Sequence, residues 1–262
     1  MARRSATRGT AASDIPTLSE ESGIRYLHFN SEWIQGAMRI GHPTELVLAY
    51  TQQMMAWMMF LAPRARDHVG ILGLGAGSLL RFTLAHTPAR VHTVERNSMV
   101  TAMCRAFFRL PGAARSTIDH EDAQCWVADP AQADRYLALM VDLYDAQAQG
   151  PVCDSLSFYR DCRRVLAETG IMTVNLFGRH ESYARNMRHI CDAFDGRVLR
   201  LPEVDEGNVV VLAFKGPALD VSCQDLMDRA AELEQACGLP CTRWARTLLA
   251  SEGWNAVGHV RI

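Results

Sequence analysis

Residues 69–97 read VGILGLGAGSLLRFTLAHTPARVHTVERN, which combines a strand pattern, a glycine-rich turn, a helix pattern and a second strand. Gly73, Gly75 and Gly77 follow the first apolar run, where a backbone without Cβ atoms can turn tightly and approach a ligand. Glu95 ends the second run, eighteen residues after Gly77, a position from which a carboxylate can accept hydrogen bonds from both ribose hydroxyls. The segment predicts a strand–helix–strand unit that holds a nucleoside. A tight turn without a ligand and a solvated acid are the alternatives.

Strand and helix patterns alternate along most of the chain. Strand-like runs occur at residues 68–74, 90–95, 116–122, 136–144, 170–177, 196–202 and 208–214. Helical patterns separate the first six runs, at residues 79–86, 98–108, 123–127, 157–166 and 181–194. Such repeats form a parallel sheet covered by helices on both faces. Only EVDEG separates the last two runs, which must therefore pair as a hairpin. We expect an α/β fold with a seven-stranded, mostly parallel sheet and an antiparallel last strand.

The chain divides into four parts around this sheet. The run IRYLHFNSEWIQGAMRI holds two β-prone stretches split by Asn30 and Ser31, which predicts a hairpin. Pro43 and Thr44 are typical of a helix start, and a helix is expected to continue to about Leu61. The expected parts are a disordered tail at residues 1–23, a β-hairpin at 24–44, the nucleoside-binding α/β domain at 45–217 and a helical extension of that domain at 218–262.

Composition excludes several classes of protein. A hydrophobic share of 48%, a charged share of 21% and a net charge of -2 are ordinary for a soluble enzyme and argue against a nucleic-acid partner. The eight cysteines are expected to be reduced, in a cytoplasmic protein. Cys237 and Cys241 lack a second ligand pair, so no metal site is expected. The apolar segment at residues 46–62 predicts a buried helix rather than a membrane span.

Acidic residues follow the third and fourth strand runs. Ligands of open parallel sheets lie at the carboxyl ends of the strands, so we expect these acids to face one. Asp122 is placed to accept a hydrogen bond from an adenine amino group, or it is an exposed turn acid. Asp142 and Asp145 flank Leu143 and Tyr144; paired acids can hold a cationic substrate and take a proton from it. The alternative for either acid is a loop cap.

The glycine pattern narrows the class of nucleoside. Dinucleotide sites carry a GxGxxG pattern, whereas this chain has Ser78 at the last position. The observed GxGxG suits a nucleoside without a pyrophosphate. An S-adenosyl compound is therefore expected.

The sequence resembles the spermidine synthase family of polyamine aminopropyltransferases over about residues 24–217. The matching pieces are the hairpin leading to a helix with Tyr50, the glycine loop, Glu95, the turn at 121–123, the quartet at 142–145 and LSFYRDCRRVLAETGIMTVNL. The resemblance implies the Rossmann-like class I methyltransferase fold. It also implies displacement at the propyl carbon beside the sulfonium of decarboxylated S-adenosylmethionine by an amine such as putrescine, with methylthioadenosine as the leaving group.

The same resemblance implies roles for individual residues. The catalytic residues are the proton acceptor Asp142 and the amine-binding Asp145. Those that hold the nucleoside are Gly73, Gly75, Gly77, Glu95, Asp122 and Ala123, and those that contact the substrate are Tyr50, Tyr144 and Gln35. No permanently bound cofactor is implied, and relatives are commonly homodimers.

Two departures from the family pattern leave the function open. Ala76 replaces the aspartate that grips the aminopropyl ammonium, and WIQGAM stands in for the family's Leu-Asp-Gly-Gln stretch. Losing such a charge-assisted hydrogen bond typically costs about 1.5–3 kcal/mol. An aminopropyltransferase acting on a small-molecule amine is expected; a methyltransferase using intact S-adenosylmethionine and a non-catalytic nucleoside-binding homologue are the alternatives.

Overall fold

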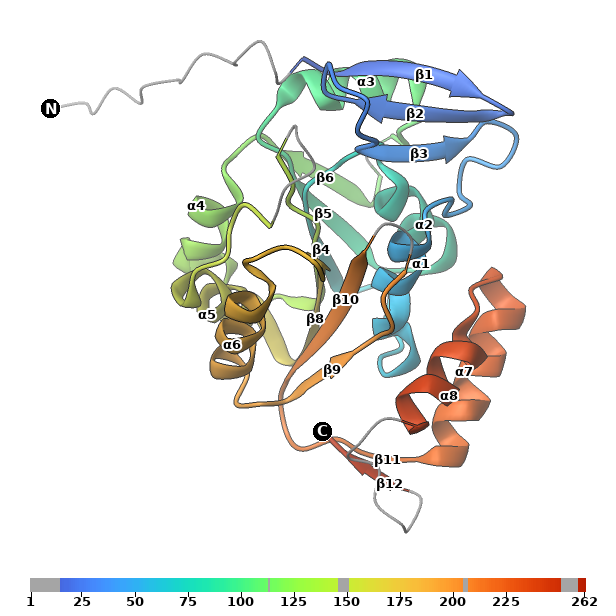
Figure 1. The fold of residues 1–262 in the computed structure, drawn as a ribbon. Helices are drawn as coiled ribbons and strands as arrows, with labels where there is room; N and C mark the ends of the chain where they lie inside the picture. The colour runs from blue at the N-terminus through green and yellow to red at the C-terminus, as the bar shows by residue number, and fades with distance from the viewer. Residues whose placement is uncertain (1–14, 113, 146–150, 205–206, 251–258) are drawn as a thin grey trace, which may run out of the picture.

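A central sheet of seven strands organises the computed structural model (Figure 1), which describes residues 15–112, 114–145, 151–204, 207–250 and 259–262. The strand order is β6-β5-β4-β7-β8-β10-β9. The strands are β4 (His68–Leu72), β5 (Arg90–Val94), β6 (Ser116–Asp119), β7 (Tyr136–Val141), β8 (Leu166–Phe177), β9 (Val198–Arg200) and β10 (Asn208–Lys215). β4 to β8 pair in parallel, and β10 lies antiparallel between β8 and β9. The predicted seven-stranded sheet with an antiparallel last strand is confirmed.

Both faces of the sheet are buried under helices. Alternate side chains of β7 show this, because Ala138 and Met140 join one apolar core while Leu139 and Val141 join the other. One face carries α1 (Ala49–Met54), the 3-10 helix η2 (Met55–Met59), α2 (Ser78–His86), α3 (Ser98–Phe107), α7 (Cys223–Cys237) and α8 (Cys241–Ala250). The other carries α4 (Ala123–Ala128), α5 (Leu156–Val165) and α6 (Tyr183–Ala193). A short 3-10 helix, η3 (Pro130–Gln132), follows α4.

The N-terminal β-structure has three strands, one more than the expected hairpin. β1 (Thr17–Glu21), β2 (Ile24–His28) and β3 (Gly36–Arg39) form an antiparallel sheet of that order. β1 falls within residues 1–23, so the expected disordered tail is wrong there; residues 1–14 lie outside the described residues. The side chains of β1 are mostly exposed, so the strand is held by backbone pairing and leaves no apolar signal in the sequence.

The helix expected from Thr44 begins later and is divided. α1 starts at Ala49 and passes into η2 at Met55. One distant and one local hydrogen bond hold the preceding segment out of the helix. The Arg81 Nε donates to the Pro43 carbonyl at 2.6 Å, and the Gln52 Nε2 donates to the Leu46 carbonyl at 2.8 Å. Residues 54–59 are buried in the core as expected. Within the described part of the chain, no helix is both long and apolar enough to cross a membrane.

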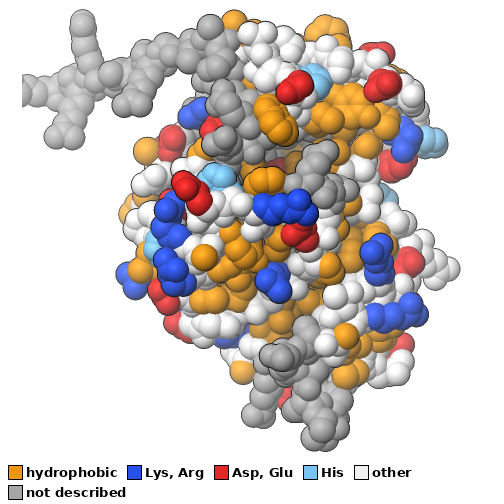
Figure 2. Space-filling model, viewed as in Figure 1, with side chains coloured by type: hydrophobic (Ala, Val, Ile, Leu, Met, Phe, Trp, Pro, Cys, Tyr) orange, Lys and Arg blue, Asp and Glu red, His pale blue; other side chains and the backbone are white. Residues whose placement is uncertain are grey.

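The C-terminal segment returns to the body of the protein. β11 (Asp220–Ser222) pairs antiparallel with β12 (His259–Arg261), a pairing that the sequence did not predict. The helices α7 and α8 lie between these strands in sequence and pack on η2, where the Arg229 Nε donates to the Met58 carbonyl at 3.3 Å. Figure 2 shows acidic and basic side chains interspersed over the visible face, in keeping with the net charge of -2.

The N-terminal sheet is pressed against the glycine loop that follows β4. A Cβ added to Gly36 would lie 2.6 Å from the nitrogen and 2.7 Å from the Cβ of Ala76. The Ser78 hydroxyl donates to the Ala37 carbonyl at 2.7 Å. The buried Arg81 adds a second fixing point, because its guanidinium donates to the Ala76 and Phe108 carbonyls as well as to Pro43. Burial lowers the pKa of Arg81 to about 10.

Replacing Gly36 by alanine is expected to lower the free energy of unfolding by about 1–3 kcal/mol, the usual cost of overpacking. The added Cβ would meet the backbone of residue 76, which cannot rotate away. Thermal or urea unfolding measures the change. Gly41→Ala is the control, since no described residue places a heavy atom within 4 Å of a Cβ there, and its effect should stay below about 0.5 kcal/mol. Equal stability of the two variants would contradict the tight contact.

Candidate active site

A cavity of about 690 Å³ opens at the carboxyl ends of the parallel strands. Its lining comes from the loops after β4, β5, β6 and β7, from the ends of β8 and β10, and from the turn between β2 and β3. This is the edge at which an open parallel sheet binds its ligands. The predicted site residues that line it are Gln35, Tyr50, Gly73, Gly75, Glu95, Asp122, Ala123, Asp142 and Tyr144.

The glycine loop lies in direct contact with the end of β7. Gly73 has a φ of +91°, and a Cβ there would lie 2.2 Å from the Asp142 carbonyl oxygen. A Cβ on Gly75 would lie 2.9 Å from the Gln35 carbonyl oxygen. Gly77 is the left-handed residue that precedes α2 and is not among the described residues lining the cavity. The first two glycines therefore serve the pocket, and the third serves the turn into the helix.

Glu95 is fixed to the backbone on two sides. Its Oε2 accepts from the Leu74 amide at 3.1 Å and its Oε1 accepts from the Asn97 amide at 2.8 Å. Burial raises the pKa of Glu95, and the two backbone hydrogen bonds oppose that rise. Since each carboxylate oxygen has a second lone pair, the group can still accept hydrogen bonds from a diol in the cavity.

Asp122 is an exposed helix cap at the edge of the cavity, and its contact with an adenine stays a prediction. It is exposed and lines the cavity, and it is also the N-cap of α4. Its Oδ1 accepts from the Gln124 amide at 2.9 Å and from the Cys125 amide at 3.3 Å. Capping of this kind typically stabilises a helix by about 1 kcal/mol, and here it also holds the side chain at the rim of the cavity.

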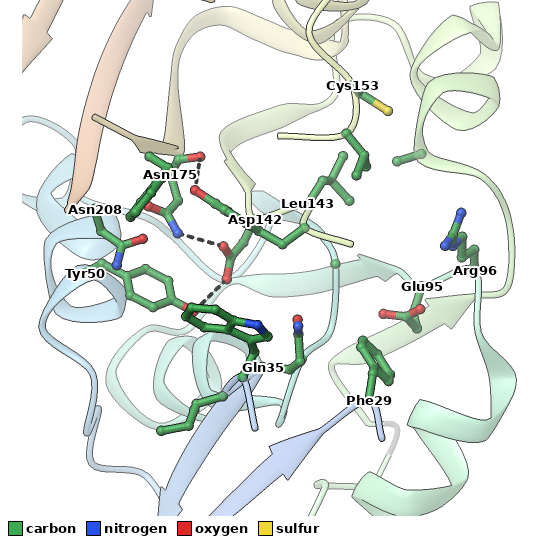
Figure 3. Close-up of a pocket in the computed structure, with 18 of the residues that line it drawn as sticks. Phe29, Gln35, Tyr50, Glu95, Arg96, Asp142, Leu143, Cys153, Asn175 and Asn208 are labelled. Atoms are coloured by element: carbon green, nitrogen blue, oxygen red, sulfur yellow. Dashed lines mark hydrogen bonds between the residues drawn. The ribbon is translucent and has the colours of Figure 1, made fainter. Parts of the chain in front are cut away.

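Asp142 is held by two neutral hydrogen-bond donors (Figure 3). The Tyr50 hydroxyl donates to Oδ2 at 3.3 Å, and the Asn175 Nδ2 donates to Oδ1 at 3.1 Å. The Tyr144 hydroxyl in turn donates to the Asn175 carbonyl at 3.2 Å. Burial raises the pKa of Asp142 to about 6, while the bonds from Asn175 and Tyr50 oppose the rise. A carboxylate with this pKa suits a general base that works near neutral pH.

Asp145 is placed differently from its expected partner Asp142. It is not among the described residues that line the cavity. Its backbone carbonyl accepts a hydrogen bond from the Gln35 Nε2 at 3.0 Å, which ties the end of the acidic quartet to the N-terminal sheet. The role of the Asp145 side chain stays a prediction.

Asn175 and Asn208 line the cavity but were not predicted from the sequence. Asn175 lies in the buried strand β8, is 2% exposed, and its Oδ1 has no hydrogen-bond partner among the described residues. Asn208 begins the antiparallel β10 and lies beside Tyr50 in Figure 3. Asn175 could have been noticed in the sequence, because it is an amide side chain near the carboxyl end of the apolar run at residues 170–177. A buried polar atom without a partner is costly, so the unpaired Oδ1 indicates a position where a ligand can donate a hydrogen bond.

Comparison with known proteins gives close relatives by sequence. The chain is 34% identical over 244 residues to a polyamine aminopropyltransferase of Neisseria meningitidis. The aligned region covers 91% of this chain and 90% of the relative. The chain is 32% identical over 248 residues to a polyamine aminopropyltransferase of Chromobacterium violaceum, covering 94% and 93%. No family model matches the chain.

Solved structures share the fold. A probable spermidine synthase from Corynebacterium glutamicum superposes with a TM-score of 0.67 at 18% identity, covering 90% of each chain. Human methyltransferase-like protein 13, in complex with SAH, superposes with a TM-score of 0.60 at 18% identity, covering 79% of this chain and 96% of that one. The Rossmann-like methyltransferase fold that the resemblance implied is confirmed.

Removing the Tyr50 hydroxyl should raise the pKa of Asp142 further above about 6. Tyr50→Phe deletes one of the donors that favour the carboxylate, and a rise of roughly one unit corresponds to about 1.4 kcal/mol. Titration of labelled aspartate carboxyl groups by ¹³C NMR measures the shift. Tyr183→Phe is the matched control, because its hydroxyl contacts Arg200 outside the cavity. An Asp142 pKa that moves equally in both variants, or in neither, would rule out the Tyr50 contact.

Proposed function

The chain belongs to the polyamine aminopropyltransferase family, and we propose that it moves the aminopropyl group of decarboxylated S-adenosylmethionine onto a diamine such as putrescine. One observation carries the proposal. A carboxylate with a raised pKa, Asp142, shares a single cavity with a backbone-anchored carboxylate suited to ribose, Glu95. The first suits proton transfer from an amine and the second suits a nucleoside.

The nucleoside half of the donor is proposed to lie on the side of the cavity formed by the loops after β4, β5 and β6. Glu95 is proposed to accept hydrogen bonds from the ribose hydroxyls, and the backbone at Gly73 and Gly75 allows close approach of the sulfonium part. Asp122 and Ala123 line the cavity beyond Glu95 and are proposed to contact the adenine. Gly77 acts through the turn that opens α2.

The charge of the cavity favours a decarboxylated donor. Intact S-adenosylmethionine carries a carboxylate on the chain that ends at the reacting sulfonium, and that group would approach Asp142. Among the described lining residues only Arg96 and His180 can carry positive charge. Figure 3 places Arg96 beside Glu95 and away from Asp142. A donor whose chain ends in an ammonium avoids the repulsion between two carboxylates.

The transfer step requires a base for the acceptor amine. An alkyl ammonium with a pKa near 10 is protonated at neutral pH and has no lone pair. Asp142 takes one proton, the freed nitrogen lone pair attacks the propyl carbon, and the carbon–sulfur bond breaks with its electrons going to sulfur. Methylthioadenosine therefore leaves without charge and needs no acid. Tyr50 and Asn175 hold the Asp142 carboxylate; Tyr144 and Asp145 are proposed to help place the amine.

The proposal is tested by following methylthioadenosine release from decarboxylated S-adenosylmethionine and putrescine. Asp142→Asn should lower turnover at least about a hundredfold, in the range removed with a general base, and leave methylthioadenosine binding unchanged. Asp129→Asn is the control, because Asp129 caps a 3-10 helix outside the cavity and asparagine caps equally well. Aminopropyl transfer would be contradicted if no diamine gave methylthioadenosine while intact S-adenosylmethionine bound tightly. It would also be contradicted if neither intact nor decarboxylated S-adenosylmethionine shifted the melting temperature of the protein.

The rate should depend on pH through Asp142. Because burial raises the pKa of this acid to about 6, the base form is lost as the pH falls through that value, well above the range of an exposed aspartate. The kcat/KM for the donor should fall about tenfold per pH unit below about 6. Tyr50→Phe should move this acid limb to higher pH. A limb that keeps its position in the variant would assign it to another group.

A further inference from the structure

The glycine loop offers no polar side chain to the donor's ammonium. Ala76 is 2% exposed and lies beneath Gly36, and it is not among the described residues lining the cavity. A longer acidic side chain at residue 76 would have to displace the N-terminal sheet. An ammonium on a three-carbon chain nonetheless needs hydrogen-bond acceptors once water is excluded. A side-chain partner for the ammonium must therefore come from another element.

Gln35, the residue before Gly36, is held over the same loop. Its backbone nitrogen donates to the Leu27 carbonyl at 2.8 Å, and its backbone carbonyl oxygen lies against Gly75. Its side chain lines the cavity, and Nε2 donates to the Asp145 carbonyl at 3.0 Å. Since Nε2 of the side chain faces the Asp145 carbonyl, the side-chain atom that remains to interact with a cation is Oε1.

The position of Gln35 matches the path of the donor chain. Figure 3 shows its side chain between Glu95 and Asp142. In the proposed function, the ribose lies at Glu95 and the reacting carbon lies near Asp142. The sulfonium and its three-carbon chain must then cross the space that Gln35 borders.

We propose that Gln35 Oε1 binds the ammonium of the aminopropyl chain of the donor. The inference rests on the proposed function and adds a residue to it. The N-terminal sheet thereby takes over from the glycine loop the recognition of the donor's charged end. The Gln35–Asp145 hydrogen bond joins that recognition to the loop after β7, so a bound donor also steadies the acceptor side.

Two sulfonium ligands that differ only in the ammonium test this role, namely decarboxylated S-adenosylmethionine and its analogue with a propyl group in place of the aminopropyl group. Gln35→Met keeps the side-chain length and removes the acceptor atom. Its affinity for decarboxylated S-adenosylmethionine, measured by calorimetry without an amine, should fall about tenfold to a hundredfold, as for a lost hydrogen bond to a charged group. Its affinity for the propyl analogue, which keeps the sulfonium and lacks the ammonium, should change less than about twofold.

The matched control is Gln224→Met. Gln224 lies on α7 and donates its side-chain amide to the Asp228 carboxylate at 2.8 Å, outside the cavity, so both affinities should stay at the wild-type value. Gln35→Glu loses the hydrogen bond to Asp145 but places a carboxylate beside the ammonium, so the ratio of its affinities for the decarboxylated donor and the propyl analogue should rise above the wild-type ratio. This ratio serves as a test even if the methionine variant misfolds. Equal losses for both ligands in Gln35→Met, or no loss for either, would overturn the role of Gln35 while leaving the function intact. Failure of the wild-type protein to bind either ligand would instead reject the proposed function.

Discussion

The contact between Gly73 and the end of β7 fixes the geometry on which the site depends. The Asp142 carbonyl oxygen lies where a Cβ on residue 73 would be. The glycine loop after β4 and the end of β7 are therefore in close backbone contact. The nucleoside loop and the reacting carboxylate thus belong to one rigid edge. Any side chain at residue 73 would push apart the two halves of the donor site before it affected a ligand.

The environment of Asp142 is a balance between burial and hydrogen bonding. Two neutral donors, from Tyr50 and Asn175, reach the carboxylate. Burial nevertheless raises its pKa to about 6. A cation in contact would favour the charged form far more strongly and would leave a weak base. Uncharged neighbours keep the group ionised at neutral pH and still able to hold a proton.

The sequence was sufficient for the features whose signals are local. Strand runs with apolar side chains on both faces, the glycines beside Glu95, and the acids at the strand ends all follow from patterns of a few residues. β1 was missed because its side chains are mostly exposed and give no apolar alternation, although its backbone pairs with β2. The late start of α1 depends on bonds from Arg81 and Gln52, one of them from a distant segment. The antiparallel direction of the last strand was predicted, and it brings the beginning of β10 to the edge where the parallel strands end. Asn208 was not assigned to the site because the sequence did not show that β10 lies directly beside β8.

Arg81 gives the binding site an all-or-none character. Its guanidinium, 3% exposed, is satisfied by carbonyls from three separate segments, at Pro43, Ala76 and Phe108. A buried cation is costly while any such partner is missing. A folding intermediate would therefore carry that cost if the segment between β3 and α1, the glycine loop or the end of α3 had not yet packed against Arg81. Partly assembled forms that could trap a nucleoside in an incomplete pocket are disfavoured, and ligand binding reports on the cooperative folding of the whole domain.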